Sequence, residues 1–104
     1  MMSEAEQLYT AIGQAIAGAE QSQMFGKPCF KLGGKAFICF FKECMVFKLN
    51  GETHKAALSL DGSELFDPSG KQRPMKEWVQ VPFVYKQQWK EFALGAANYL
   101  NQKQ

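Results

Sequence analysis

The chain has 104 residues, of which 46% are hydrophobic and 13% aromatic, and its formal net charge is +2. This length predicts one domain, and the apolar share excludes an intrinsically disordered chain. The charge excludes a strongly basic protein, and sequence-specific DNA reading is not favoured because Arg73 is the single arginine.

The cysteines and the hydropathy pattern predict a cytoplasmic protein. Cys29, Cys39 and Cys44 form no CxxC pair. An odd number of cysteines without a secretory segment favours free thiols in a reducing compartment. No apolar run reaches the roughly 20 residues of a membrane span, so no membrane partner is expected.

The first predicted element is an amphipathic helix from about residue 4 to residue 18. Ser3 and Glu6 form a capping-box pattern at its start. Gly13 lies inside this helix at a cost of up to about 1 kcal/mol relative to alanine, and a close approach to the sheet would explain it. The polar residues 21–23 are interpreted as a connection. The apolar stripe of the helix consists of Leu8, Ile12, Ala15, Ile16 and Ala19.

Residues 24–49 predict three short strands joined by tight turns, and the rest of the chain is expected to pack around them. Residues 33–34 are both glycine, which indicates a two-residue hairpin loop in which Phe30 would pair with Phe37. Residues 42–43 are expected to form the next turn.

The run 36–41 is apolar at every position, so the alternation typical of a half-buried strand is lost. Such a run favours a strand covered on both faces. We expect helices on one face and a loop or a partner subunit on the other.

The C-terminal half predicts fewer strands. Residues 52–58 favour a short helix followed by a loop, and a hairpin centred on residues 61–62 is the alternative. Residues 67–70 match a type I turn. Residues 78–81 predict a strand, and an apolar stripe predicts the final helix over residues 85–100. Together these elements predict an α+β fold, with a curved antiparallel sheet packed between or against an N-terminal and a C-terminal helix in a single domain spanning residues 1–104.

The candidate binding residues are basic or aromatic. Lys31, Lys35 and Lys48 are expected on adjacent strands, as a basic stripe or as solvent-facing lysines that protect edge strands. Arg73 lies in a predicted loop shortly before Trp78. This segment is interpreted as an ordinary solvated loop, and contact with a phosphate or an acidic partner is the alternative.

No catalytic, cofactor-binding or metal-ligating residue is predicted. His54 is the only histidine and is interpreted as an exposed polar residue on the short helix. The carboxylates are not clustered as acid–base chemistry requires, and the cysteines lack the spacing of a zinc site. We therefore expect a non-enzymatic domain without a cofactor.

Four short motifs stand out: Met24-Phe25-Gly26, residues 32–37, Phe47-Lys48-Leu49, and Trp78 with Val81-Pro82. These motifs resemble the TfoX N-terminal domain family, and residues 26–37 also resemble the related MmcQ/YjbR proteins. The resemblance implies a compact α+β domain linked to competence regulation or to DNA-binding folds, with no catalytic residues to transfer. Residues 20–23, where the family often carries arginines, are Glu-Gln-Ser-Gln here.

The expected function is a protein- or ligand-interaction module, with a homodimer or another protein as the partner. The alternative is a nucleic-acid-associated regulator that uses a lysine-bearing sheet face. An enzyme ranks third.

Overall fold

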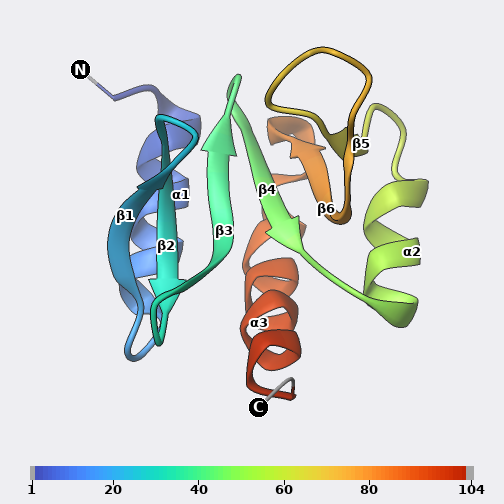
Figure 1. The fold of residues 1–104 in the computed structure, drawn as a ribbon. Coiled ribbons are helices and arrows are strands. Elements are labelled where there is room, and N and C mark those ends of the chain that lie inside the picture. The colour runs from blue at the N-terminus through green and yellow to red at the C-terminus, as the bar shows by residue number, and fades with distance from the viewer. Residues whose placement is uncertain (1, 103–104) are drawn as a thin grey trace.

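The computed structural model describes residues 2–102, and in it helices α1 and α3 lie on one side of a twisted antiparallel sheet (Figure 1). The sheet has the strand order β1-β2-β3-β4-β6-β5, and every neighbouring pair is antiparallel. The expected α+β class, with helices near both ends of the chain, is confirmed. The elements are α1 (Glu4–Ala15), β1 (Glu20–Met24), β2 (Lys27–Leu32), β3 (Lys35–Phe41), β4 (Cys44–Lys48), α2 (Gly51–Ser59), β5 (Glu64–Phe66), β6 (Met75–Pro82), a 3₁₀ turn (Phe83–Tyr85) and α3 (Lys86–Gln102).

Helix α1 begins as the capping-box pattern predicts and ends earlier than expected. The Ser3 hydroxyl accepts a hydrogen bond from the Glu6 amide at 3.1 Å. The helix stops before Ile16, which has an extended backbone conformation. A Cβ atom at Gly13 would lie 2.1 Å from Cε2 of Phe30, so the predicted close approach between helix and sheet is confirmed.

Three two-residue turns connect the first four strands. Both residues of each turn, at positions 25–26, 33–34 and 42–43, have left-handed φ angles, as type I′ hairpins require. The predictions for the second and third turns are confirmed. The interpretation of residues 21–23 as a connection is wrong, because they belong to β1. An edge strand needs little apolar character, since only one of its sides pairs with the sheet.

A β-bulge changes the register expected for β2 and β3. Phe30 pairs with Ile38 rather than with Phe37, whereas Lys31 pairs with Ala36 as the two-residue loop requires. Phe37 is the extra residue on β3. A bulge inserts one residue opposite a regular strand, and the sequence pattern around the glycine turn carries no sign of it.

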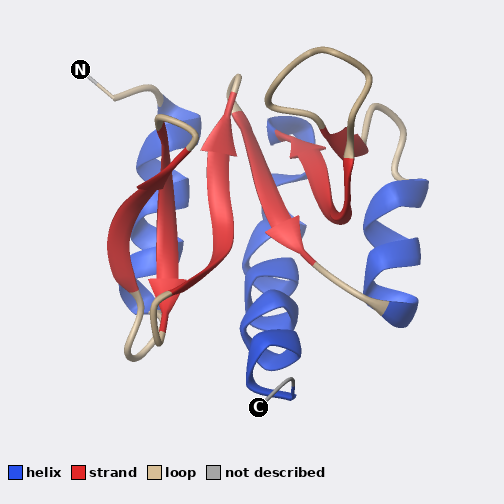
Figure 2. Cartoon of the chain, in the orientation of Figure 1, coloured by secondary structure: helices blue, strands red, loops and turns tan. Residues whose placement is uncertain are grey.

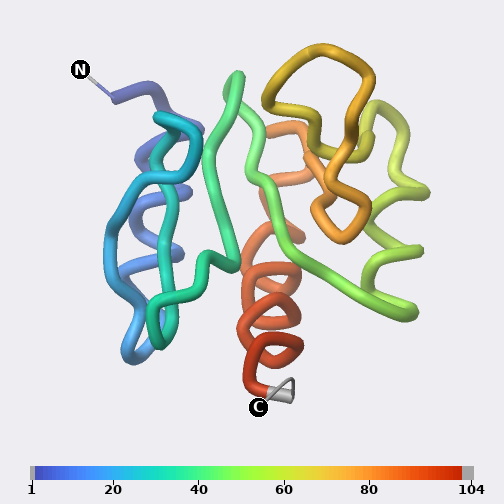
Figure 3. The backbone as a smooth tube through the Cα atoms, viewed as in Figure 1, coloured from blue at the N-terminus to red at the C-terminus, as the bar shows by residue number. Residues whose placement is uncertain are grey.

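The second half contains one strand that the sequence analysis assigned to a loop. The helix expected at 52–58 is confirmed as part of α2, which packs against β6 and α3. Residues 64–66 form β5, in which Phe66 pairs with Met75. Figure 3 shows the following loop, 67–74, arching beyond the same end of the sheet as the 42–43 turn. The strand predicted at 78–81 is confirmed within β6.

The two faces of the sheet bury two separate clusters. Helices α1 and α3 cover one face of the sheet (Figure 2), and their side chains pack on the strands there. On the helix-free face the buried residues are Cys29, Cys39, Val46, Phe66 and Trp78.

Strand β3 is buried on both faces, as its uninterrupted apolar run predicts. The cover on the helix-free face comes from this chain. The centroid of the Phe66 ring lies 5.3 Å from the centroid of the Phe41 ring and 6.5 Å from that of Trp78. A partner subunit is therefore not needed to bury this face.

The final helix is confirmed, with a 3₁₀ turn before it. Trp89 is fully buried, and its indole N–H donates to the Pro82 carbonyl at 3.2 Å. This bond ties the start of α3 to the end of β6. No helix within residues 2–102 combines the length and apolar character that crossing a bilayer demands.

Candidate functional site

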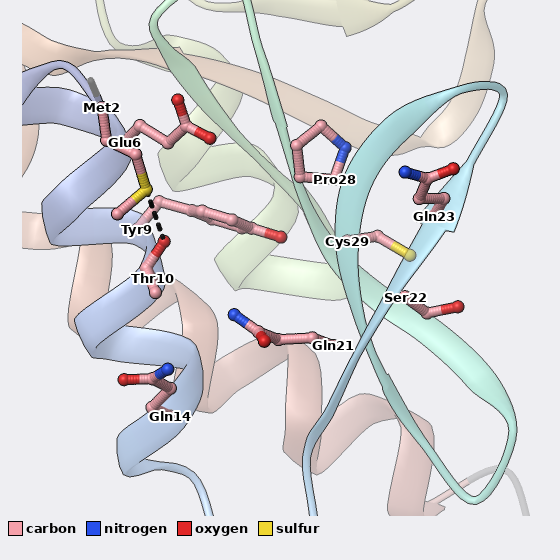
Figure 4. A pocket seen from close by; sticks show the side chains of 10 residues that line it. All are labelled: Met2, Glu6, Tyr9, Thr10, Gln14, Gln21, Ser22, Gln23, Pro28 and Cys29. Carbon is pink, nitrogen blue, oxygen red and sulfur yellow. Dashed lines mark hydrogen bonds between the residues drawn. The ribbon is translucent and has the colours of Figure 1, made fainter.

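A polar pocket of about 380 Å³ lies between α1 and the strands β1 and β2 (Figure 4). Met2, Glu6, Thr10 and Gln14 line its helix side. They are four residues apart, and such a spacing places side chains on one stripe of a helix. The pocket therefore follows α1 along the edge of the sheet.

The strand side of the pocket is built mainly from β1. Gln21, Ser22 and Gln23 line it, together with Pro28 and Cys29 of β2. Figure 4 shows the Gln21 side chain extending toward α1. Two primary amides therefore lie on this wall, each with donor and acceptor groups.

Tyr9 is the buried residue of this site. The centroid of its ring lies 5.4 Å from the ring centroids of both Phe30 and Phe40, and the residue is only 2% exposed. Figure 4 shows its side chain reaching from α1 toward β2. The hydroxyl has no hydrogen-bond partner within the described part of the chain. Buried hydroxyl groups are normally paired.

The environment of Tyr9 keeps its hydroxyl protonated. Burial is the main cause that raises the pKa of Tyr9 above its ordinary value, and the negative charge of Glu6 acts in the same direction. A neutral phenol donates its O–H and has lone pairs to spare. The site thus offers one buried hydroxyl donor, a carboxylate acceptor at Glu6, and the amides of Gln21 and Gln23.

This arrangement is suited to hydrogen bonding and not to metal chemistry. Among residues 2–102, no three His, Cys, Asp or Glu side chains are grouped as a metal site requires. Burial also raises the pKa of Cys29, which opposes the thiolate form needed by a nucleophile or a soft-metal ligand.

A second pocket, of about 370 Å³, lies between α2 and α3. Glu52 and Glu91 lie on its two sides, with Gly95 between the helices. No buried side-chain atom that lines it lacks a partner among the described residues. It therefore has no counterpart to the buried Tyr9 hydroxyl, and the α1–β1 pocket is the stronger candidate.

The candidate lysines do not converge on one surface. Opposed residues of neighbouring antiparallel strands share a face. Lys48 pairs with Trp78 and therefore lies on the helix-free face. Lys31, which pairs with Glu20, lies on the same face. Lys35 pairs with Leu32, whose side chain packs on the helix-covered cluster.

The remaining candidates, Trp78 and Arg73, have structural surroundings of their own. Trp78 is 6% exposed and packs near Phe66, so little of its ring is open to a stacking base. Arg73 lies in the exposed 67–74 loop, where its backbone N–H donates to the Asp67 carboxylate at 3.1 Å.

His54 has a structural contact rather than the exposed position expected for it. Its Nε2 atom lies 2.8 Å from the Lys76 carbonyl oxygen, and this contact joins α2 to β6. The His54 ring is therefore engaged by the backbone of β6.

The sequence analysis missed the residues that form the α1–β1 pocket. The stripe predicted for α1 omitted Tyr9, although Ala5, Tyr9 and Ile12 follow helical spacing and are the buried ones. Gln21 and Gln23 were placed in a connection. The Gly26 turn is the signal that was available, because a two-residue hairpin at 25–26 implies a strand before it.

Comparison with known proteins assigns no family, since no family model, no curated protein and no solved structure matches this chain.

Proposed function

We propose that this chain is a non-enzymatic interaction module whose α1–β1 pocket binds a small neutral polar group with the chemistry of a carboxamide. The observation that carries the proposal is the Tyr9 hydroxyl, which is buried beside the pocket without a partner among the described residues. An unpaired buried hydroxyl costs about 1–3 kcal/mol. A ligand oxygen that accepts its hydrogen bond recovers part of that cost.

The charge of Glu6 disfavours an anionic ligand, and the Tyr9 hydroxyl donor disfavours an ammonium group, which has no hydrogen-bond acceptor. A carboxamide carbonyl accepts from Tyr9, while its N–H₂ donates to the Glu6 carboxylate or to the side-chain carbonyls of Gln21 and Gln23. A carboxylate ligand would meet the like charge of Glu6. The volume is near the lower end of the usual range for small-molecule sites, about 300–1,000 Å³.

The alternative, a nucleic-acid-associated regulator, has weaker support. It needs a stripe of lysines with an aromatic ring available for stacking. Lys35 lies on the opposite face from Lys31, and Trp78 is buried.

A cytoplasmic location and kinship with the TfoX N-terminal and YjbR-like proteins belong to the same proposal. Cys29 and Cys39 stand opposite one another on β2 and β3 and are free thiols, which supports a reducing compartment. The kinship rests on the short motifs, two of which contain the turns at 25–26 and 33–34.

The ligand chemistry is tested with three small molecules of matched size: propionamide, propionate and propylammonium. Binding is followed by amide NMR shifts of α1 and β1. We expect propionamide to produce the largest shifts, and Tyr9→Phe to weaken its binding about three- to tenfold, because one hydrogen bond contributes about 0.5–1.5 kcal/mol. Tyr85→Phe is the matched control, since its hydroxyl donates to the Asp61 carbonyl at 2.7 Å, outside the pocket.

Unfolding experiments on the same variants test the unpaired hydroxyl without a ligand. Tyr9→Phe should leave the free energy of unfolding unchanged or raise it, whereas Tyr85→Phe should lower it by about 1 kcal/mol. Equal binding of propionate, or propionamide binding that survives Tyr9→Phe undiminished, would overturn the proposal.

A further inference from the structure

Strand β1 is an open edge of the sheet. It pairs only with β2, at one end of the strand order. Natural edge strands are usually protected by lysine, proline, a bulge or a short length. β1 has five residues, Glu-Gln-Ser-Gln-Met, with neither lysine nor proline and a regular register against β2. Its one charged residue, Glu20, lies at the start of the strand, so residues 21–24 carry no charge. The opposite edge, β5, has only three residues.

The 25–26 turn determines which backbone groups of β1 point outward. In a two-residue hairpin the residues that flank the turn, here Met24 and Lys27, exchange both of their backbone hydrogen bonds. Alternation along the strand then directs the N–H and C=O groups of Gln21 and Gln23 away from β2. These groups bond to no other residue within 2–102.

We propose that two copies of this chain associate through β1, pairing antiparallel about Ser22 and joining their sheets into one. In this register Gln21 exchanges backbone hydrogen bonds with the partner's Gln23, and Gln23 does so with the partner's Gln21. Both are the residues whose backbone groups point outward, so the pairing satisfies them in each copy.

The side chains of β1 complement a second β1 in the same register. Gln21 lies beside the partner's Gln23, and primary amides donate to and accept from one another. Glu20 lies beside the partner's Met24, so no like charges are opposed. A slip of one residue would pair side chains from opposite faces, and a slip of two would shorten the overlap.

The association changes the surroundings of the α1–β1 pocket. Gln21 and Gln23 line that pocket, so the partner's Gln21 and Gln23 extend its strand wall. The two-fold axis is perpendicular to the sheet, which places both α1 helices on the same side of the joined sheet. This inference goes beyond the proposed function and does not rest on it.

Sedimentation velocity over a wide concentration series tests the association in the unmodified chain. Two double variants then locate the contact. Gln21→Lys with Gln23→Lys opposes like charges across the pairing, whereas Gln21→Lys with Gln23→Glu opposes unlike charges. We expect the first to weaken the dimer about two- to thirtyfold, because two like-charge pairs of about 0.2–1 kcal/mol each are opposed across the two-fold axis, and the second to retain it.

The controls separate this inference from the proposed function. Both double variants alter the same exposed positions, so a folding defect would appear in both and is monitored by circular dichroism. Tyr9→Phe should not change association, since its hydroxyl takes no part in the pairing. A wild-type chain that sediments as a monomer at every concentration, or two double variants with equal dimer affinity, would overturn the inference.

Discussion

On the helix-covered face of the sheet, α1 and α3 supply the side chains that bury the strands, whereas on the helix-free face Phe66 closes over a smaller cluster. The first cluster contains Phe47 and Trp89, and the second contains both buried cysteines and Val46. Consecutive residues of β4 thus enter different cores. A sheet with helices on one face can bury the other when a short edge strand, here β5, brings one aromatic ring onto it.

The largest expected difference in stability between the two faces is measured by substituting two neighbouring residues of β4. Phe47→Ala should lower the free energy of unfolding by about 3–5 kcal/mol, because it empties a core position. The centroid of the Phe47 ring lies 5.6 Å from that of Phe92. Val46→Ala should cost about 2 kcal/mol, since it removes less buried apolar volume. Urea denaturation of both variants provides the comparison. A greater cost for Val46→Ala would mean that the helix-free cluster is the main core.

The pH dependence of stability reports the burial of Cys39 on the helix-free face. Burial raises the pKa of this thiol to about 12 from 9.0. The Cys39 thiol of the native chain therefore keeps a proton that the unfolded chain releases. The contribution of this thiol to stability is complete below pH 9 and is lost as the pH rises. Between pH 9 and pH 11 the loss should be about 2–3 kcal/mol. Urea midpoints at these pH values measure it. Cys39→Ala should flatten this slope, and a variant slope equal to that of the wild type would contradict the assignment.

Two helical glycines test how tightly the helices fit the sheet and one another. Gly13→Ala should lower the free energy of unfolding by about 1–2 kcal/mol, because the buried Phe30 ring must move and the helix propensity gain of about 1 kcal/mol offsets only part of that cost.

Gly95→Ala in α3 is the matched control. Its Cβ would lie 3.1 Å from Cγ2 of Thr53, and the same propensity gain should keep the change below about 1 kcal/mol. Thermal unfolding of both variants measures the difference. A Gly13→Ala chain as stable as Gly95→Ala would show that α1 moves freely over β2.

The smallest expected effect concerns the loop that follows Phe66. The Asp67 carboxylate accepts hydrogen bonds from the Ser69 hydroxyl and from the backbone N–H groups of Ser69, Gly70 and Arg73, and the Ser69 bond is the main cause that lowers its pKa below 3.8. The NMR shifts of the Ser69 and Gly70 amides should titrate with a midpoint below 3.8. Asp67→Asn should abolish this transition, and a midpoint above 3.8 would contradict the hydrogen-bonded loop.

The sequence predicted the parts of the fold that depend on local chemistry. Residues 33–34 and 42–43 specify turns through their backbone requirements, and the stripe through Trp89 and Phe92 specifies the final helix. Strand β1 was missed because polar residues at a sheet edge resemble a loop. Strand β5 was missed because Phe66 becomes buried only when β6 and Phe41 meet it.

The candidate site depended on tertiary contacts and could not be read from a motif. The Tyr9 hydroxyl is notable only because Phe30 and Phe40 bury the ring while leaving the oxygen unpaired. The basic and aromatic residues selected from the sequence divide between two faces and a loop. Residue type identified those side chains, and only the strand register shows which of them share a surface.

The bulge at Phe37 alters how much side-chain volume β3 delivers to each side. A regular strand alternates, so two consecutive residues cannot enter the same core. With one extra residue, Phe37 and Ile38 both pack beneath the helices, followed by Phe40, while Cys39 remains on the opposite side. The irregularity thus acts as a local gain in packing density. It gives the larger core an additional aromatic ring and moves the strand partners of Phe30 and Cys29 along by one residue.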